Sequence, residues 1–349
     1  IDIDEKSLNE IGQWPWPRQT MANIFKEIDK KQPLVVGVDI IFSENDRYAS
    51  KNLAEFFNID ETELNVLGIK DGDKDLADTM LEKPYVIAIS AIDKNDQSQE
   101  KQAVISGKMV VINAADELLY QADKLLTPIK ALENTTGFGF VNTIKEDGII
   151  RKTPLILNIN NQLYPSLNLD MIRVAQNAST HIVKKDDVGD KLLVKSGEMV
   201  AQLDLDGVFN LHHGNADRFP RASILDVMRG EIDLQDKIII VGSSASGLGD
   251  FHASNIESEV AGPLFHLQVI DQVLGQRFIN FHPVYDQIIY FLALLFAIAL
   301  SMLVAQLPIY AILLLVPTAI LPLYYLAKYA FLGFGVVVYM QVAAGIFFF

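Results

Sequence analysis

Residues 34–42 read Leu34-Val35-Val36-Gly37-Val38-Asp39-Ile40-Ile41-Phe42, a run in which Asp39 is the only polar side chain. A strand that is apolar on both faces is typical of a parallel sheet covered by helices on both sides. The residues just before this run carry apolar side chains at the spacing of an amphipathic helix, namely Met21, Ile24, Phe25 and Ile28. An amphipathic helix that leads into a doubly buried strand predicts an α/β fold.

The same alternation of helices and strands continues along the chain. Apolar runs predict further strands at residues 1–4, 85–91, 104–114, 137–143 and 237–242. Helical spacing predicts helices at residues 20–31, 73–81, 166–176, 223–229 and 260–274. Shorter alternating runs predict antiparallel strands at residues 153–160, 162–165 and within 182–206. We therefore predict an α/β domain over residues 1–280, with a mostly parallel central sheet flanked by helices and an antiparallel insertion near residues 140–210.

A second region begins near residue 281. From Gln287 to Phe349 the only charged side chain is Lys328. A bilayer core of about 30 Å is crossed by roughly 20 apolar residues in a helix, and breaks near Pro308 and Lys328 divide the run into three such segments. We therefore predict a C-terminal unit of three transmembrane helices, at about residues 287–305, 309–327 and 329–349. A buried helical hairpin in a soluble domain does not fit three adjacent apolar segments that share one charge.

The charge balance limits the partners of the domain. Residues 1–286 carry 28 Lys and Arg and all 44 Asp and Glu, a formal net charge of −16. This charge argues against nucleic acid or anionic lipid headgroups as the main partner. The chain contains no cysteine, so we expect neither a disulfide framework nor a thiolate metal site.

Both ends of the sequence are expected to be internal to a longer protein. The chain opens at Ile1 in a strand-like run and stops at Phe349 inside an apolar run. An odd number of membrane spans places residues 1–280 and whatever follows Phe349 on opposite sides of the membrane. That arrangement is typical of a signal transducer.

The run Trp14-Pro15-Trp16-Pro17-Arg18 is the first candidate for a binding site. Two prolines stiffen its backbone, and two indoles offer large, rigid contact surfaces. In one interpretation Trp14, Trp16 and Arg18 form a ligand or dimer surface in which Arg18 holds a carboxylate. In the other, the tryptophans fill the core and Arg18 pairs with an acidic side chain of the domain.

Asp39 is the second candidate, because a carboxylate within an apolar strand costs several kcal/mol unless it is paired or hydrogen-bonded. Three partners are open to it: Arg18, a helix N-terminus, or water in a cleft. Together with Ser43, Glu44 and Asp46, which follow closely, it could also form a cation site. We favour a structural acid held by a salt bridge over a cation site.

The strand at residues 237–242 runs into a turn rich in glycine and serine that ends at Asp250. Such turns often bind anions through backbone N–H groups, but both the P-loop lysine and the Gly-x-Gly-x-x-Gly spacing are missing. The histidines lack the spacing of a helical zinc site, and the run Asp204–Gly207 lacks the later ligands of a calcium loop. We therefore predict no cofactor, no metal and no catalytic residue in this segment.

Several of these landmarks together resemble the type-2 CHASE domain, the cyclase/histidine-kinase-associated sensory extracellular module. Its motifs occur in the expected order over nearly all of residues 1–280: the opening strand, Trp14–Arg18, Gly37–Phe42, Gly139–Asn142, Asp147–Leu155, Asp226–Gly230, Lys237–Asp250 and Gly262–Leu274. Three membrane helices after the domain are also typical of that family. The sequence departs from the family pattern at Ser254-Asn255, Gly262-Pro263 and Leu267.

The resemblance implies an extracytoplasmic sensor joined to a cytoplasmic nucleotide cyclase, histidine kinase or serine/threonine kinase that begins after Phe349. It implies a multi-pass protein of the inner (plasma) membrane, in contact with membrane lipid, that forms a homodimer and keeps residues 1–280 outside the cytoplasm. An unknown ligand or protein partner is then expected at six residues: Trp14, Trp16, Arg18, Asp39, Asp250 and His266.

Two other functions are open to this sequence. A structural or assembly membrane protein would use the domain to bind partners in the cell envelope, and it would lack a ligand-sized pocket. A membrane enzyme or transporter is disfavoured because the three predicted spans hold few polar side chains, chiefly Gln306, Lys328 and Gln341.

Overall fold

The computed structural model describes residues 1–69, 71–92, 108–112, 119–187, 190–245, 247–248 and 251–279, together with residues 291, 294, 295, 298, 299, 302, 321, 324, 325, 328 and 329. The chain divides into two compact units, Ile1–Gln276 and Arg277–Phe349. The helices and strands given below all belong to the first unit.

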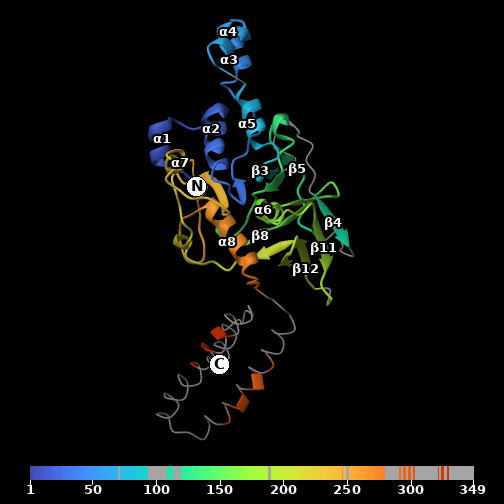
Figure 1. The fold of residues 1–349 in the computed structure, drawn as a ribbon. Coiled ribbons are helices and arrows are strands. Elements are labelled where there is room, and N and C mark those ends of the chain that lie inside the picture. Colours follow the sequence, from blue (N-terminus) through green and yellow to red (C-terminus); the bar gives the residue numbers. More distant parts are fainter. Residues whose placement is uncertain are drawn as a thin grey trace. The chain divides into compact units, whose positions relative to one another are not determined.

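A six-stranded sheet lies at the centre of the first unit (Figure 1). Five strands run parallel, in the order β1 (Asp2–Ile3), β15 (Ile238–Ser243), β2 (Val35–Val38), β3 (Tyr85–Ile92) and β6 (Gly137–Phe140). The sixth strand, β5 (Lys124–Leu126), pairs antiparallel with the end of β3. The predicted α/β fold with a mostly parallel central sheet is therefore confirmed.

Helices cover both faces of this sheet. One face carries α2 (Arg18–Asp29), α5 (Gly72–Met80) and α7 (Ile224–Met228), and the other carries α6 (Leu167–Ala175) and α8 (Gly262–Leu274). The alternation of side chains along β2 explains this division. Val36 packs in the core cluster with α2, whereas a Cβ on the next residue, Gly37, would lie 2.3 Å from the sulfur of Met171 on α6.

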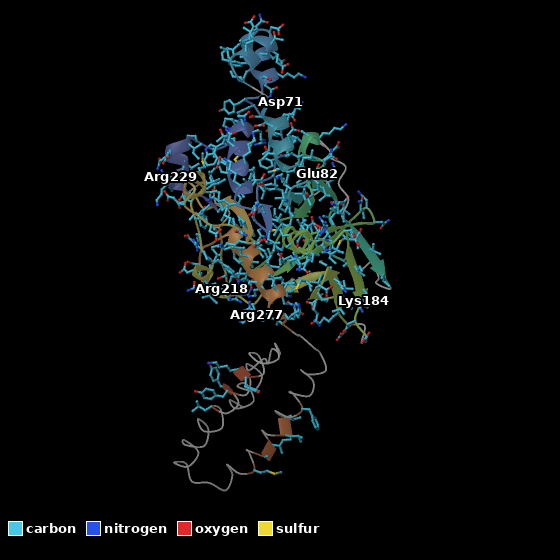
Figure 2. All side chains as sticks on the ribbon, in the orientation of Figure 1. Asp71, Glu82, Lys184, Arg218, Arg229 and Arg277 are labelled. Atoms are coloured by element: carbon cyan, nitrogen blue, oxygen red, sulfur yellow. The ribbon has the colours of Figure 1, made fainter. Side chains whose placement is uncertain are left out.

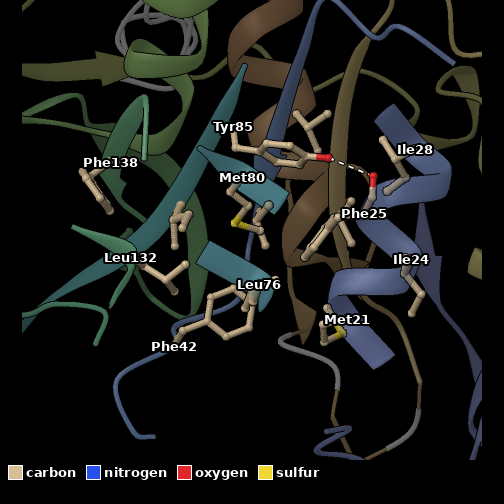
Figure 3. Packing of buried hydrophobic residues seen from close by; sticks show 14 of the residues in the cluster. Met21, Ile24, Phe25, Ile28, Phe42, Leu76, Met80, Tyr85, Leu132 and Phe138 are labelled. Carbon is tan, nitrogen blue, oxygen red and sulfur yellow. Dashed lines mark hydrogen bonds between the residues drawn. The ribbon is translucent and has the colours of Figure 1, made fainter. Parts of the chain in front are cut away.

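The main hydrophobic core lies between the sheet and helices α2 and α5 (Figure 3). The four apolar residues of α2 that the helical spacing picks out are fully buried there, namely Met21, Ile24, Phe25 and Ile28, and so is Ala22. The ring of Tyr85 meets Phe25 edge-on, with centroids 5.4 Å apart. Its hydroxyl lies 2.7 Å from Asp29 Oδ1 and 3.2 Å from the carbonyl oxygen of Phe25. Burial, reinforced by Asp29, raises the pKa of Tyr85, so the phenol stays neutral.

Most of the antiparallel strands lie within residues 144–210, before and after α6. β9 (Ile156–Ile159) and β10 (Gln162–Pro165) form a hairpin at Asn160-Asn161, whose φ angles of 51° and 64° suit a tight two-residue turn. A three-stranded sheet contains β7 (Ile144–Glu146), β8 (Ile149–Pro154) and β14 (Val208–Asn210). A four-stranded sheet has the order β13 (Met199–Leu203), β12 (Leu192–Ser196), β11 (His181–Lys185) and β4 (Met109–Ile112), in which β4 runs parallel to β11.

The remaining elements connect these layers. They are α1 (Glu5–Ile11), α3 (Ser50–Phe57), α4 (Glu61–Val66), the 3-10 helices η2 (Lys130–Leu132) and η3 (Ala216–Arg218), and the strands β16 (Phe251–His252) and β17 (Val260–Ala261). Helices α3 and α4 pack on each other and project from the sheet and its covering helices (Figure 1). Several charged side chains labelled in Figure 2 lie on the outside of the unit: Asp71, Glu82, Lys184, Arg218 and Arg229.

The predicted membrane segment lies mostly beyond what the structure describes. The three spans, at residues 287–305, 309–327 and 329–349, contain only scattered described positions. Within the described part of the chain, no helix has both the length and the apolar character needed to cross a bilayer.

Candidate ligand-binding site

A cleft of about 500 Å³ opens at the carboxyl ends of the parallel strands. Its floor is made by the strand ends or the residues just after them: Ile3, Asp39, Ile40, Val141 and Ser243. One wall is the run Trp14–Arg18, and the other is the loop of residues 43–48 that follows β2.

The topology of the sheet explains why a cleft forms at this place. Strands β15 and β2 are neighbours, but the chain leaves them towards opposite faces of the sheet. From β2 it leads through α3 and α4 to α5, on the same face as α2, whereas from β15 it leads to α8, on the same face as α6. Open α/β sheets bind ligands at such a point of divergence, outside the carboxyl ends of the strands.

Trp14 and Trp16 both belong to the first wall, but they differ in burial. Trp16 is only 2% exposed and belongs to the hydrophobic core, and its indole Nε1 donates a hydrogen bond to the carbonyl oxygen of Gly12 at 2.7 Å. Trp14 is partly exposed and meets Trp16 edge-on, with ring centroids 5.4 Å apart. The core interpretation therefore holds for Trp16, while both rings still border the cleft.

Arg18 is held within this wall by the domain itself. Its Nε lies 3.6 Å from Asp73 Oδ1, and both side chains are 11% exposed. Its Nη2 donates to the carbonyl oxygen of Glu44 at 3.1 Å, and its guanidinium lies 4.5 Å from the ring centre of Phe42. Burial lowers the pKa of Arg18, although the carboxylate of Asp73 opposes the shift. Arg18 thus pairs with an acidic side chain of the domain, and that acid is Asp73 and not Asp39.

Asp46 fixes the loop on the opposite wall. Helix α2 begins after Pro17, which offers no side-chain cap, and Asp46 Oδ2 instead accepts a hydrogen bond from the backbone N–H of Arg18 at 2.9 Å. Asp46 Oδ1 accepts one from the backbone N–H of Tyr48 at 3.1 Å. The backbone N–H of Asp46 donates in turn to Asp73 Oδ2 at 3.0 Å. Burial raises the pKa of Asp73 despite this hydrogen bond and the nearby Arg18.

Asp39 lies at the cleft floor, with its side chain 18% exposed. Its backbone N–H donates to the carbonyl oxygen of Val241 at 2.9 Å, which ties it to the end of β15. Its Oδ2 lies 3.8 Å from Nε2 of His266, and both residues also border a second, smaller cavity of about 30 Å³. Of the partners predicted for Asp39, the structure therefore supports the cleft and not Arg18.

His266 joins the cleft to helix α8. It is the fifth residue of this helix, is 7% exposed, and its Nδ1 donates to Asn168 Oδ1 of α6 at 2.5 Å. Two further polar side chains of α8 are buried: Gln268 lies 3.2 Å from His213 Nδ1, and Gln272 accepts from the backbone N–H of His212 at 2.8 Å. Polar contacts therefore tie α8 both to the sheet and to the antiparallel strands.

The structure brings most of the predicted site residues together. One cleft is bordered by Trp14, Trp16, Arg18 and Asp39. His266 is not part of its lining, but His266 Nε2 lies 3.8 Å from Asp39 Oδ2. Asp250 lies outside the described residues. The cation-site alternative finds no support, because the described residues contain no group of three or more side chains arranged to hold a metal ion.

Sequence reasoning missed a buried polar network beneath the antiparallel strands. Asp170 Oδ1 accepts from Arg173 Nε at 2.5 Å and lies 3.2 Å from His181 Nε2, and His181 Nδ1 lies 2.7 Å from Ser196 Oγ. The order Ser196, His181, Asp170 resembles a hydrolase triad. All three residues are at most 2% exposed and Asp170 also holds Arg173, so the network is structural.

The chain forms an α/β domain with a cleft at the carboxyl edge of its central sheet. Comparison with protein families gives a match to the CHASE2 domain over residues 1–305, and the chain therefore belongs to the CHASE2 family. This match confirms the resemblance to the CHASE2 domain that the motifs indicated. CHASE2 is a family of sensory domains found in signalling receptors. No curated protein and no solved structure matches the chain.

Proposed function

We propose that this chain is the extracytoplasmic sensory region of a transmembrane receptor, in which a ligand in the cleft controls a cytoplasmic output domain beyond Phe349. The ligand would contact Trp14, Trp16 and Asp39. Arg18 would hold the wall of residues 14–18 in place through its ion pair with Asp73. The observation that carries the proposal is the contact between Asp39 at the cleft floor and His266 on α8. The role of Asp250 stays a prediction.

The coupling would run along α8. A ligand that attracts or displaces the Asp39 carboxylate would change the distance between Asp39 and His266. The hydrogen bond from His266 to Asn168 would then pass this change on to α6. Because His266, Gln268 and Gln272 of α8 are buried and hydrogen-bonded, the helix would have few intermediate positions and would respond as a rigid element. Helix α8 is also the last helix described before residue 277, where the second unit begins.

The membrane part of the proposal rests on composition. The single charge between Gln287 and Phe349 favours three membrane spans, and an odd number of spans favours an output domain, a nucleotide cyclase or a kinase, on the cytoplasmic side. A homodimer suits both kinds of output domain. Sequencing the gene downstream of the Phe349 codon tests this part: a cyclase or kinase reading frame supports it, and a stop codon directly after the third span contradicts it.

The whole protein should lose normal signalling when Asp39 is replaced by Asn. The substitution keeps the shape of the side chain but removes its charge, so both its attraction for a ligand and its interaction with His266 change. The output of the full-length protein should therefore differ from that of the unchanged protein. Asp78→Asn is the matched control, because Asp78 is exposed on α5 and does not border the cleft. Normal output from a folded Asp39→Asn variant would count against the proposal.

A second candidate function has one observation in its favour. Helices α3 and α4 expose large apolar side chains, with Phe56 81% and Val66 87% accessible. Such a surface suits an assembly protein that binds partners in the cell envelope. The two functions differ in their response to substitution: Phe56→Ser with Val66→Ser would abolish activity in the assembly protein, and would leave ligand responses intact in the receptor.

A further inference from the structure

We propose that one face of the four-stranded sheet of β13, β12, β11 and β4 rests on the membrane surface and binds anionic phospholipid there. We call it the outer sheet face, and it consists of the positions at which these strands point away from the buried side of the sheet. This inference rests on the membrane anchoring in the proposed function, and it goes further by giving the sensory domain a lipid contact of its own.

Side chains alternate along these strands between the buried side and the outer sheet face. On β11, His181 and Val183 are buried, whereas Ile182 and Lys184 are exposed. The strands lie side by side (Figure 1), and their register carries this alternation across the sheet. One row of the outer sheet face therefore crosses the four strands at Val110, Ile182, Lys195 and Val200.

The outer sheet face is more apolar than a solvated sheet face should be. Its second row crosses the strands at Ile112, Lys184, Leu193 and Gln202. Five of the eight positions in the two rows are apolar, and Val110 and Ile112 are each 47% exposed. An antiparallel sheet with one side in water normally carries polar side chains on that side. An exposed apolar face of this kind marks an interaction site.

The charges of the outer sheet face suit an anionic partner. Its two charged residues are Lys184 and Lys195, both exposed, and Lys184 lies on the outside of the unit (Figure 2). Acidic residues lie instead in the turns between the strands, at Asp186, Asp187, Asp190 and Glu198. Residues 181–203 carry four lysines and four acidic residues, whereas residues 1–286 carry a net charge of −16. An anionic surface that repels the domain as a whole is thus attracted by this face.

The outer sheet face also lies where the chain leaves the first unit. Gln276, the last residue of that unit, donates from Nε2 to the carbonyl oxygen of Val200 at 3.3 Å. Ten residues, 277–286, separate it from the predicted first span, and they can extend at most about 36 Å. Four paired strands cover about 14 Å. So short a connection gives the face a high effective concentration at the bilayer, so a modest affinity for lipid is enough.

The chain has another exposed apolar surface, on α3 and α4, which serves as a comparison. Its side chains Phe56 and Val66 are more exposed than those of the outer sheet face. Residues 50–67, however, carry four acidic side chains against one lysine, a formal net charge of −3. An anionic lipid surface repels such a segment, so the two surfaces share their apolar character and differ in charge.

The full chain in lipid nanodiscs tests the proposal, and the absence of cysteine gives each label a single site. Ile182→Cys on the outer sheet face and Val66→Cys on α4 are each labelled with bimane. The discs contain phosphatidylcholine brominated in its acyl chains, with or without phosphatidylglycerol. Bromine quenches a fluorophore only at close range, so quenching reports contact with lipid. Melting of each variant shows that it is folded.

The label at position 182 should be quenched in discs with phosphatidylglycerol, and the label at position 66 should not. Adding Lys184→Gln with Lys195→Gln should lower the ratio of quenched to unquenched chains by about tenfold or more, since each lysine near an anionic surface contributes about fivefold. Lys51→Gln with Lys74→Gln removes the same charge at exposed positions of α3 and α5 and should leave the ratio unchanged. High salt should weaken the quenching at position 182.

Three results overturn this inference: no quenching at position 182, equal quenching at positions 182 and 66, and quenching at 182 that neither phosphatidylglycerol nor the two lysines affect. A label at 182 that is unquenched, but whose emission shifts when two chains share a disc, assigns the face to a second copy instead. All of these leave membrane anchoring intact, because the chain is in the disc. A chain that does not enter the disc contradicts the anchoring in the proposed function, and this inference falls with it.

Discussion

Asp170→Asn should lower the free energy of unfolding of the domain by about 3–5 kcal/mol, because it leaves Arg173 as an uncompensated charge in the interior. Asp170 is 2% exposed and Arg173 3%. The carboxylate accepts two hydrogen bonds from Arg173, at 2.5 and 3.0 Å, and a third from the backbone N–H of Phe138 at 3.0 Å. The melting temperature should fall by roughly 10 °C or more.

The matched control and the pH dependence make this prediction specific. Asp233→Asn makes the same chemical change in an exposed ion pair with Lys237, and it should shift the melting temperature little. Burial alone would raise the pKa of Asp170, but hydrogen bonds from His181 and Arg173 hold it below the ordinary value of 3.8. Its contribution is therefore complete above pH 3.8 and is lost as the pH falls through the lower folded pKa. Equal melting temperatures of the unchanged protein and Asp170→Asn at neutral pH would contradict this account.

Gly139→Ala should destabilise the domain by about 3 kcal/mol, at the upper end for overpacking, because the new Cβ would meet backbone and not a movable side chain. A Cβ on Gly139 would lie 2.3 Å from the nitrogen and 2.4 Å from the Cα of Leu167, at the start of α6. A shift of α6 away from β6 would disrupt hydrogen bonds at the start of the helix. Ser166 caps α6, and the backbone N–H of Ser166 donates to the carbonyl oxygen of Leu155.

The same substitution should also disturb the cleft, since α6 carries Asn168, the partner of His266. Gly214→Ala is the control, because the three atoms nearest to its Cβ would all belong to the guanidinium end of Arg218, a flexible side chain. Chemical denaturation of both variants measures the difference. A Gly139→Ala protein as stable as Gly214→Ala would show that β6 and α6 are not packed as described.

Elements whose signal is local could be predicted from the sequence. Helix α2 spans Arg18–Asp29 and strand β3 spans Tyr85–Ile92, close to the predicted residues 20–31 and 85–91. Strand β2 ends at Val38, earlier than the apolar run suggests, and the residues that follow it line the cleft. Apolar spacing reports burial and not strand pairing: Ile40 packs against the core, and both Ile40 and Ile41 border the cleft beyond the end of β2.

The partners within the site could not be predicted, because they depend on contacts between distant parts of the chain. Arg18 meets Asp73, the second residue of α5, and no pattern distinguishes this acid from its neighbours Asp71 and Asp75. Asp39 and His266 come together only through the pairing of β2 with β15, which places α8 beside the carboxyl end of β2. The resemblance pointed to His266, but it supplied no partner for it.

Two further features gave no usable signal. Phe56 and Phe57 are adjacent on α3 and both exposed, and the spacing of apolar residues along a helix does not show whether the rest of the domain covers them. Asp170 and Arg173 lie three residues apart on an apolar helix, a spacing that most often marks an exposed ion pair. Only their burial distinguishes the structural network from a surface contact.

The central claim is that occupation of the cleft is transmitted to α8, and the absence of cysteine from the chain allows it to be tested directly. Ser43→Cys creates a single reactive thiol that borders the cleft, and a bulky maleimide attached there acts as a permanent occupant. Ser179→Cys, at an exposed position outside the cleft, is the control for labelling.

Hydrogen–deuterium exchange of residues 262–274 in the labelled chain is the decisive measurement. The account predicts that the label at position 43 changes the exchange of α8, whereas the label at position 179 does not. Complete labelling at position 43 with unchanged exchange throughout α8 would contradict the account.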